Sequence, residues 1–358
     1  MKAALFTAVN EKLVVKDGVT LGELGPKDVH VKIKAAGICH SDLSIINGKI
    51  PGITNSVMGH EGAGIVLAVG KDVTRVKVDD HIVIAWGPPC GACFHCGVRE
   101  PQLCEKGMQQ TRTPHFQLDG NMIMSSIGTA TMCEETIIPE ISAIKILKDV
   151  PFEVAALVGC GVTTGVGAAL NSAEVRPGSS VVVFGCGGVG IAAIQGCKVA
   201  GASEIVGVDP FETRQAWAKE FGATHACSPK DLGALQSKLT RNRGFDYAFE
   251  VVGKSETIRA AWDATRRGGT VTVLGVTAMD DTVQFGGVEL FYSEKTLRGS
   301  MYGSSDVRVD FNRYLGLWRN GRLDLDGMIT KRFKLEEVNE AFDALRDGSV
   351  VRSVITFD

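Results

Sequence analysis

The stretch SSVVVFGCGGVGIAAIQGCKVAGASEIVGVDP, residues 179–210, decides the fold of this chain. An apolar run at 181–184 has the length of a buried strand, a glycine-rich turn and a helical pattern follow, and a second apolar run ends at Asp209. Further along the chain, predicted strands continue to alternate with predicted helices, one of them over 255–269. Alternating β and α units predict a doubly wound parallel sheet, and the fold class is therefore α/β.

The turn GCGGVG lies between the predicted strand and the predicted helix, which is the context that a dinucleotide-binding fingerprint requires. We expect Gly185 to permit the tight turn, Gly187 to let a pyrophosphate approach the backbone, and Gly190 to let the helix pack closely on the strand. The helix N-terminus favours the negative charge of the phosphates. The cofactor contacts expected in this turn are Gly185, Gly187, Gly188, Val189 and Gly190.

Asp209 follows Gly190 by 19 residues, at the end of the second predicted strand. A carboxylate at this place can accept hydrogen bonds from both ribose hydroxyls of NAD and repels the 2′-phosphate of NADP. Arg214 follows one helical turn later, and its guanidinium could tolerate a phosphate, but we expect Asp209 to dominate. The sequence therefore predicts NAD. The alternative is that Asp209 is a surface acid at a strand end.

The remainder of the chain has a different pattern. Residues 1–158 show short β patterns bounded by glycine, such as the alternation in VHVKIKAAG at 29–37, and few helices. Beyond residue 300 the alternation of strands and helices breaks again. We expect a β-rich domain over 1–158, the parallel-sheet domain over 159–300, and a return of 301–358 to the first domain.

Composition narrows the class of protein. The chain has 358 residues, of which 44% are hydrophobic and 22% charged, with a net charge of −3, as in globular proteins of two domains. This charge balance gives no reason to expect nucleic acid or an anionic membrane as a partner. The first residues lack a signal-peptide pattern, and no apolar stretch approaches the ~20 residues that span a bilayer. Ten cysteines without a secretion signal suggest a reducing compartment, and we expect a cytoplasmic protein.

Four cysteines are clustered in CGACFHCGVREPQLC, with the spacing C-x2-C-x2-C-x7-C. Four thiolates can close a tetrahedron around zinc and leave no free position, so the cluster predicts a structural zinc lobe over about 88–108. An iron–sulfur cluster or disulfides are the rival interpretations. A zinc ribbon that binds nucleic acid is disfavoured, because no basic run surrounds the cysteines. The predicted ligands are Cys90, Cys93, Cys96 and Cys104.

Three more candidate ligands are scattered along the chain: Cys39 in GICHSD, His60 in GHEGAG and Cys160 in GCGVTTG. A catalytic zinc takes three protein ligands of this kind and keeps one position open. Each residue alone would more often be an ordinary packed side chain, but their joint occurrence beside a nucleotide-binding fold favours a metal site. The four remaining cysteines are expected to be buried small hydrophobes: Cys133, Cys186, Cys197 and Cys227.

The motif GHE-x2-G-x5-G-x2-V runs from Gly59 to Val73. Together with Cys39, the four-cysteine lobe and the fingerprint, it closely resembles the medium-chain zinc-dependent alcohol dehydrogenases over essentially the whole chain. The resemblance implies a GroES-like catalytic domain and a Rossmann domain, one catalytic and one structural zinc, and a homodimer or homotetramer. It also implies reversible oxidation of an alcohol to an aldehyde or ketone, with hydride transfer to NAD.

The same resemblance implies roles for residues around the catalytic zinc. Cys39, His60 and Cys160 would bind the metal. Glu61 matches an acidic neighbour that can approach the metal during ligand exchange, and Asp42 matches a carboxylate that orients the ring of His60.

Further residues match the family's proton relay and its cofactor contacts. Ser41 matches a hydroxyl that passes the alcohol proton towards the cofactor ribose. Ser44 stands where many relatives have a histidine, so the last proton acceptor is left open between water and His40. His40 more closely matches a pyrophosphate contact, as does Arg352. Thr164 matches a residue that packs against the nicotinamide, and Val189 matches one behind that ring.

Two residues match walls of the family's substrate pocket, Trp86 and Ile50. An indole beside the zinc would narrow the pocket and favour primary or flat aromatic alcohols. The alternative for Trp86 is core packing. The sequence also resembles relatives that oxidise a thiol adduct of formaldehyde, and relatives that hold the nicotinamide tightly and recycle it with an external acceptor. A non-catalytic nucleotide-binding relative is disfavoured, because all three catalytic ligands are present.

Overall fold

The computed structural model describes residues 1–107 and 115–358, so the last residue of the predicted zinc lobe, 108, lies outside the described residues. The chain divides into two compact units. The first unit consists of Met1–Cys160, Asp306–Trp318 and Leu325–Asp358, and the second of Gly161–Ser305 and Arg319–Asp324. The segment 301–358, which we assigned to the first domain, thus also contributes two short pieces to the second unit.

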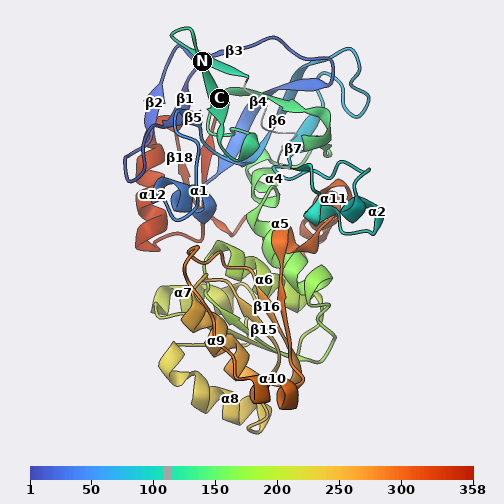
Figure 1. The fold of residues 1–358 in the computed structure, drawn as a ribbon, viewed down its shortest axis with the longest axis vertical. Helices are drawn as coiled ribbons and strands as arrows, with labels where there is room; N and C mark the ends of the chain where they lie inside the picture. The colour runs from blue at the N-terminus through green and yellow to red at the C-terminus, as the bar shows by residue number, and fades with distance from the viewer. Residues whose placement is uncertain (108–114) are drawn as a thin grey trace. The chain divides into compact units, whose positions relative to one another are not determined.

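The second unit is built on one sheet of six parallel strands (Figure 1). In spatial order the strands are β14 (His225–Cys227), β13 (Glu204–Val208), β12 (Ser180–Phe184), β15 (Phe245–Glu250), β16 (Thr265–Val273) and β17 (Thr296–Gly299). Counted from β12 this is the order 3-2-1-4-5-6 of the Rossmann fold, in which the strand order reverses between β12 and β15. The predicted fold class is confirmed.

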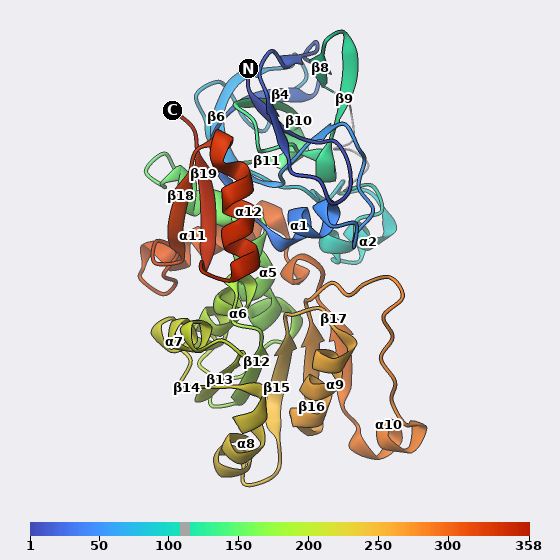
Figure 2. The ribbon, with the colours of Figure 1, turned by 90° about the vertical axis from the view of Figure 1, so that its left-hand side faces the viewer.

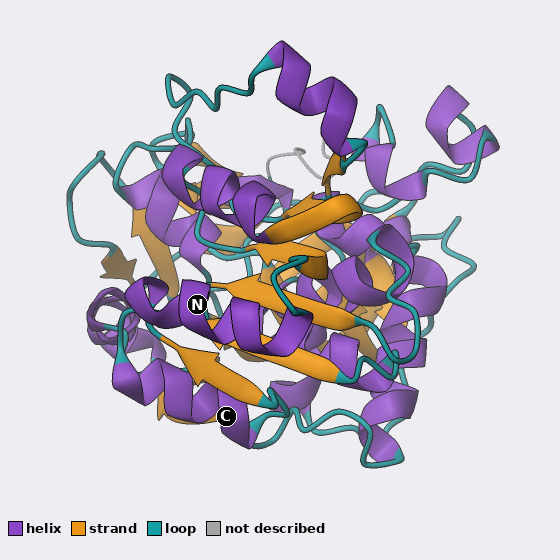
Figure 3. Ribbon diagram, turned by 90° about the horizontal axis from the view of Figure 1, so that it is seen from below, coloured by secondary structure: helices purple, strands orange, loops and turns teal. Residues whose placement is uncertain are grey.

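Helices lie on both sides of these strands (Figure 3). Among them, α6 and α7 pack against β13, and α9 packs against β15 and β16. The helix expected over 255–269 ends earlier, at Ala264, because Thr265–Val273 pairs with β15 and so belongs to the sheet. The helices are α5 (Gly161–Gly167), a π-helix (Ala168–Ser172), α6 (Gly188–Val199), α7 (Glu212–Glu220), α8 (Leu232–Thr240), α9 (Ser255–Ala264) and α10 (Gly287–Ser293).

The first unit is rich in β-strands, which form two sheets. One sheet has the order β2 (Val14–Lys16), β1 (Ala3–Phe6), β5 (Ser56–Val57), β9 (Asn121–Ser125), β8 (Phe116–Leu118), β3 (Thr20–Leu21). The other has the order β11 (Ala143–Lys145), β7 (His81–Ile84), β6 (Glu61–Val69), β4 (Asp28–Gly37), β19 (Arg352–Thr356), β18 (Ile329–Phe333), and β10 (Glu135–Pro139) also pairs with β4.

Strand β4 explains how this unit is held together. Its alternate residues Val29, Val31 and Ile33 are fully buried, as the sequence pattern predicted, and they join an apolar cluster with residues of β6 and β7. The last strand of the chain, β19, pairs antiparallel with β4. Helix α12 packs beside β19 (Figure 2) and ends at Gly348, which has a left-handed φ of 69°. The end of the chain therefore completes the first unit.

The helices of this unit are short, apart from α11 and α12. They are α1 (His40–Ile46), α2 (Phe94–Gly97), α4 (Phe152–Val158), α11 (Val307–Arg319) and α12 (Val338–Asp347). Within the described residues, no single helix has both the length and the apolar character needed to cross a membrane. One bent pair of helices, Phe152–Val158 with Gly161–Ser172, has the necessary combined length and apolar composition, and nothing beyond these two properties points to a membrane span.

Candidate active site

The structure brings the three scattered ligand candidates together. One ligand atom each from Cys39, His60, Cys160 and the neighbouring Glu61 lie within 4.8 Å of one another, and all four residues are buried. The cluster lies entirely within the first unit. Residues up to 121 positions apart in the sequence thus form one cluster of possible metal-ligand atoms, as the resemblance implied.

Local structure fixes each donor. Cys39 is the extended residue immediately before α1, so its side chain is not part of the helical turn. His60 directly precedes β6, and Cys160 lies two residues after α4. Strand β4 pairs Gly37 with Glu61, and a Cβ at Gly37 would collide with the Glu61 carboxylate. The absence of a side chain at Gly37 is what gives the Glu61 carboxylate its place in the cluster.

Asp42 orients the ring of His60. The carboxylate of Asp42 lies 3.1 Å from Nδ1 of His60, and both side chains are buried. Burial alone would lower the pKa of His60, but the charges of Asp42 and Cys39 raise it well above its ordinary value. With Nδ1 committed to Asp42, Nε2 is left as a buried nitrogen without a hydrogen-bond partner among the described residues. A metal ion satisfies such a nitrogen.

The two thiols differ in acidity. A hydrogen bond from Cys160, together with the charges of His60 and Arg352, holds the pKa of Cys39 well below its ordinary value. The same hydrogen bond, together with burial, raises the pKa of Cys160 well above its ordinary value. A second thiolate therefore needs additional positive charge, which a coordinated zinc ion supplies. Two sulfurs and one imidazole nitrogen are a ligand set of catalytic zinc, so these residues fit the metal.

Glu61 forms a buried ion pair with Arg352 of β19, between Oε2 and Nη2. Burial raises the pKa of Glu61 to about 8, although the charge of Arg352 opposes this. Sequence reasoning missed the pair, because its members lie 291 positions apart and no local pattern connects them. Arg352 was expected to contact a pyrophosphate; here its guanidinium lies against Glu61, and the pyrophosphate role stays a prediction.

Ser41 and Ser44 both lie on α1. The hydroxyl of Ser41 is 3.7 Å from the sulfur of Cys39, which places it beside the metal ligands. The carbonyl of Ser44 accepts a hydrogen bond from the backbone of Ile50 at 3.1 Å. His40, at the start of the helix, is exposed. The relay roles of these residues stay predictions.

Of the two predicted pocket walls, Trp86 lies near the metal ligands. Its ring centroid is 6.4 Å from that of His60, with the two rings nearly perpendicular. Ile50 is partly buried and packs against the apolar cluster that includes Ile45, Ile46 and Phe342. The structure therefore places an indole beside a ligand and Ile50 against the core, and their contact with substrate stays a prediction.

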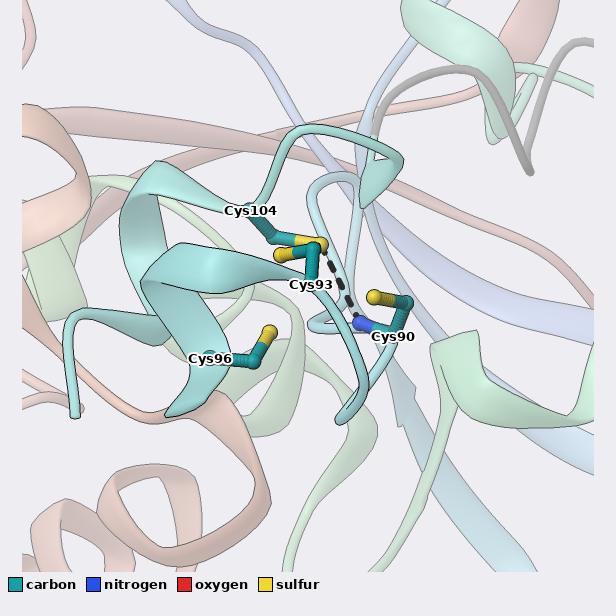
Figure 4. A group of neighbouring side chains, drawn as sticks. All are labelled: Cys90, Cys93, Cys96 and Cys104. Carbon is teal, nitrogen blue, oxygen red and sulfur yellow. Dashed lines mark hydrogen bonds between the residues drawn. The ribbon is translucent and has the colours of Figure 1, made fainter. Parts of the chain in front are cut away.

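The four clustered cysteines form a second group (Figure 4). Their sulfurs all lie within 4.8 Å of one another, and no disulfide joins them. Backbone N–H groups point at the sulfurs: that of Cys90 donates to Cys104 at 3.2 Å. Backbone hydrogen bonds lower the pKa of Cys93 to about 6, whereas burial raises that of Cys96 to about 12. Four convergent sulfurs fit a closed structural zinc site, and the disulfide interpretation is wrong.

The other four cysteines are buried, as expected, and burial raises the pKa of each: Cys133, Cys186, Cys197 and Cys227.

In the second unit, the glycine turn has the form of a phosphate-binding cradle. Gly185 follows β12 with a φ of 95°, a conformation that favours glycine. Gly187 caps the N-terminus of α6, and a Cβ there would meet nothing within 4 Å. A Cβ at Gly190 would collide with the carbonyl oxygen of Gly185. The open space over Gly187 and the helix N-terminus fit a dinucleotide pyrophosphate.

Asp209 comes directly after β13 and is only 2% exposed, so it is not a surface acid. Its two oxygens accept hydrogen bonds from the backbone N–H groups of Cys186, at 3.0 Å, and Phe211, at 3.1 Å. Asp209 therefore connects the glycine turn to the turn after β13, a bracing role that sequence reasoning missed. Two other predicted cofactor contacts lie on helices, Thr164 on α5 and Val189 on α6, and their roles stay predictions.

Two family models match this chain: the alcohol dehydrogenase GroES-like domain over residues 25–149 and the zinc-binding dehydrogenase domain over residues 188–318. A putative alcohol dehydrogenase D of Mycobacterium tuberculosis is 39% identical, with 92% of this chain and 93% of the relative covered. The S-(hydroxymethyl)glutathione dehydrogenase of Paracoccus denitrificans is 34% identical, with 93% and 94% covered.

Among solved structures, the benzyl alcohol dehydrogenase of Acinetobacter calcoaceticus is similar with a TM-score of 0.92 and 30% identity, covering 100% of this chain and 99% of that one. The fold, the two clusters and these relatives define a zinc-binding oxidoreductase. The chain belongs to the medium-chain zinc-dependent alcohol dehydrogenase family.

Proposed function

We propose that this alcohol dehydrogenase uses NAD to oxidise an alcohol reversibly to an aldehyde or ketone, with catalytic zinc held by Cys39, His60 and Cys160. The observation that carries the proposal is the buried cluster of these three residues, in which Nε2 of His60 lacks a hydrogen-bond partner among the described residues. When bound there, zinc supplies a Lewis acid that polarises the oxygen of an alcohol or a carbonyl.

The residues around the ligands have separate tasks in this proposal. Asp42 holds the His60 ring in the tautomer that leaves Nε2 free for the metal. Ser41 accepts the proton that the alcohol loses, and it lies 3.7 Å from the Cys39 sulfur. Ser44 cannot complete the relay as a histidine would, so the proton leaves Ser41 through water or His40. Arg352 pairs with Glu61 and opposes the rise in its pKa that burial causes, so this carboxyl is not left without a charged partner beside the two sulfurs.

The second unit binds the cofactor in this proposal. The buried carboxylate of Asp209 accepts the ribose hydroxyls and repels a 2′-phosphate, which supports NAD over NADP. The test is steady-state kinetics with each coenzyme at a saturating alcohol concentration. We expect kcat/KM to be higher with NAD; a higher value with NADP would overturn the assignment.

The substrate class follows from Trp86, which places an indole beside the metal ligands. A wide flat side chain here narrows the space for branched substrates and favours primary or flat aromatic alcohols. The similarity to a benzyl alcohol dehydrogenase supports an aromatic alcohol. A panel of primary, aromatic and bulky secondary alcohols tests this, and preference for bulky secondary alcohols would contradict it.

A second candidate substrate is a thiol adduct of formaldehyde, favoured by the similarity to an S-(hydroxymethyl)glutathione dehydrogenase. Formaldehyde mixed with glutathione would then be turned over faster than any simple alcohol in the panel.

A further alternative is that the protein holds its nicotinamide tightly and recycles it with an external acceptor. The purified protein, denatured before any cofactor is added, tests this: NADH fluorescence in the supernatant would favour recycling by an external acceptor.

The proposed assembly is a homo-oligomer. Strand β17 is the edge of the parallel sheet, and all four of its residues are exposed. Helix α10 also exposes large apolar side chains: Val288, Leu290, Phe291 and Tyr292. An open strand edge beside exposed apolar side chains suits pairing with a second copy. Light scattering after size exclusion is expected to give a dimer or tetramer, and a monomer would contradict the proposal.

A further inference from the structure

Glu250 is a fully buried carboxylate at the carboxyl end of β15. One of its oxygens, Oε1, accepts three hydrogen bonds: from the backbone N–H groups of Val252 and Gly253, each at 2.8 Å, and from the hydroxyl of Thr257 at 2.7 Å. The other oxygen, Oε2, is buried and has no hydrogen-bond partner among the described residues. A buried carboxylate with an unused oxygen costs folding free energy, which indicates a role other than stability.

The same residue also holds the turn after the neighbouring strand, β16. The backbone carbonyl of Glu250 accepts hydrogen bonds from the N–H groups of Leu274, at 2.8 Å, and Gly275, at 3.1 Å. A Cβ at Gly275 would collide with the backbone nitrogen of Gly253 and would lie 2.8 Å from Oε2 of Glu250. The turns after β15 and β16 therefore lie backbone against backbone, with the carboxylate of Glu250 beside both.

These two turns border the glycine turn of the proposed cofactor site. A Cβ at Gly185 would lie 2.9 Å from a methyl carbon of Val252, so the Val252 side chain lies directly beside the first glycine. Val252 and Val276 are nevertheless 46% and 67% exposed. In this strand order a dinucleotide binds across the point where the order reverses, which is here between β12 and β15. The two turns lie on the β15 side of that point, and Asp209 lies on the β13 side.

We propose that Glu250 is a positioning residue for the cofactor, and that it acts on the half of the dinucleotide that carries the nicotinamide. This inference rests on the proposed binding of a nicotinamide dinucleotide by the second unit. Such a sheet has two mononucleotide-binding halves, and the carboxylate of Asp209 is proposed to hold the adenosine ribose. The turns after β15 and β16 belong to the other half. Because Glu250 is fully buried, it acts by fixing the path of these turns and not by direct contact.

The experiment is isothermal titration of the full chain with two probes, NADH and 5′-AMP, which share the adenosine half and differ in the nicotinamide half. Glu250→Ala removes the acceptor of three donors, so the turns lose their fixed path. We expect this variant to weaken NADH binding by about tenfold and 5′-AMP binding by less than about twofold. Glu250→Gln keeps an oxygen for the same donors without the charge, and we expect NADH binding to weaken by only about threefold.

The matched control is Glu256→Ala, which removes a carboxylate from the first turn of α9. The side chain of Glu256 is 74% exposed, and its ion pair with Lys254 lies at the surface. Solvent screens such a pair, so we expect this variant to bind each probe within about twofold of the wild type.

A role of Glu250 in stability alone gives a different result. The melting temperature would then fall while the ratio of the two affinities stayed at its wild-type value in both Glu250 variants, and the inference would be overturned. Circular dichroism checks that each variant is folded; if Glu250→Ala does not fold, the ratio in Glu250→Gln decides the question.

The failure of the proposed function is distinguishable from the failure of this inference. A wild-type protein that binds neither NADH nor 5′-AMP would overturn the proposed cofactor site, and the inference with it. A wild-type protein that binds both, with the same ratio of affinities in the wild type and in the Glu250 variants, would overturn the inference alone.

Discussion

The two cysteine clusters of the first unit use the same kind of donor in different surroundings. The four lobe cysteines lie within 15 consecutive residues and are partly exposed, and backbone N–H groups point at their sulfurs. The cluster of Cys39, His60 and Cys160 is buried and is assembled from three separate segments, with ionisable side chains around it. The lobe cysteines are brought together because they are near one another in the sequence. The residues of the buried cluster are brought together by the folding of distant segments.

This difference supports different proposed roles for the two sites. Four thiolates around zinc would leave no position for a substrate, so we propose that zinc in the lobe contributes to stability. Three ligands would leave one position open, and we propose that the surrounding carboxylates and guanidinium tune the charge at that position. The two regions also differ in one matched detail: a histidine paired with a carboxylate belongs to the buried cluster, and another such pair lies in the lobe beside its four cysteines. The pair of His60 and Asp42 is buried, and the pair of His95 and Glu100 is exposed.

The largest effect is expected from Cys160→Ser. Loss of this ligand removes the Lewis acid contribution, and kcat/KM is expected to fall by about 10³-fold or more. The secondary structure is expected to survive, because the substitution changes one atom in the core. Kinetics and circular dichroism check this, with Cys197→Ser, another buried cysteine, as the control that keeps activity. Full turnover by Cys160→Ser would show that the cluster is not catalytic.

Cys93→Ser is expected to act on stability. The lobe loses one of four ligands, and the melting temperature is expected to fall by roughly 5–10 °C. Enzyme that remains folded at 25 °C is expected to retain most of its kcat. Thermal melting measures the change in melting temperature, and an activity assay normalised to the amount of folded protein measures kcat. An unchanged melting temperature together with a large loss of kcat would reverse the roles assigned to the two clusters.

Asp42→Asn tests the buried histidine pair. Without the carboxylate the His60 ring loses its fixed tautomer, and zinc affinity or kcat is expected to fall by about 10- to 100-fold. Competition with a chelator measures the zinc affinity. The idea fails if Asp42→Asn binds zinc and turns over as the wild type does.

The smallest effect is expected from Glu100→Gln, the matched change in the lobe. The pair of His95 and Glu100 spans 3.0 Å, close to the 3.1 Å of the buried pair, but its side chains are 31% and 50% exposed, against 2% and 0%. Solvent screens an exposed pair, so the change in unfolding free energy is expected to stay within about 0.5 kcal/mol. Denaturant titration of both variants checks this. A loss of unfolding free energy in Glu100→Gln as large as that measured for Asp42→Asn would show that burial is not what separates the two pairs.

Much of this architecture could be predicted from the sequence, because its signals are local. The alternation of strand and helix patterns from residue 181 onwards predicted the parallel sheet, and the spacing of the lobe cysteines predicted a closed cluster. The scattered ligands needed the family resemblance, since nothing in the surroundings of Cys39 alone indicates Cys160. The sequence also contained no sign that Arg352 pairs with Glu61, or that Asp209 braces the glycine turn, because both depend on how distant strands pair.

The central claim is that each cluster holds one zinc, and the most direct measurement is the zinc content per chain of the wild type, Cys160→Ser and Cys93→Ser. We predict about two zinc ions per chain in the wild type and about one in each variant, since each variant loses a ligand from one cluster and keeps the other intact. A wild type with a single zinc, or a Cys160→Ser protein that keeps both, would contradict the account.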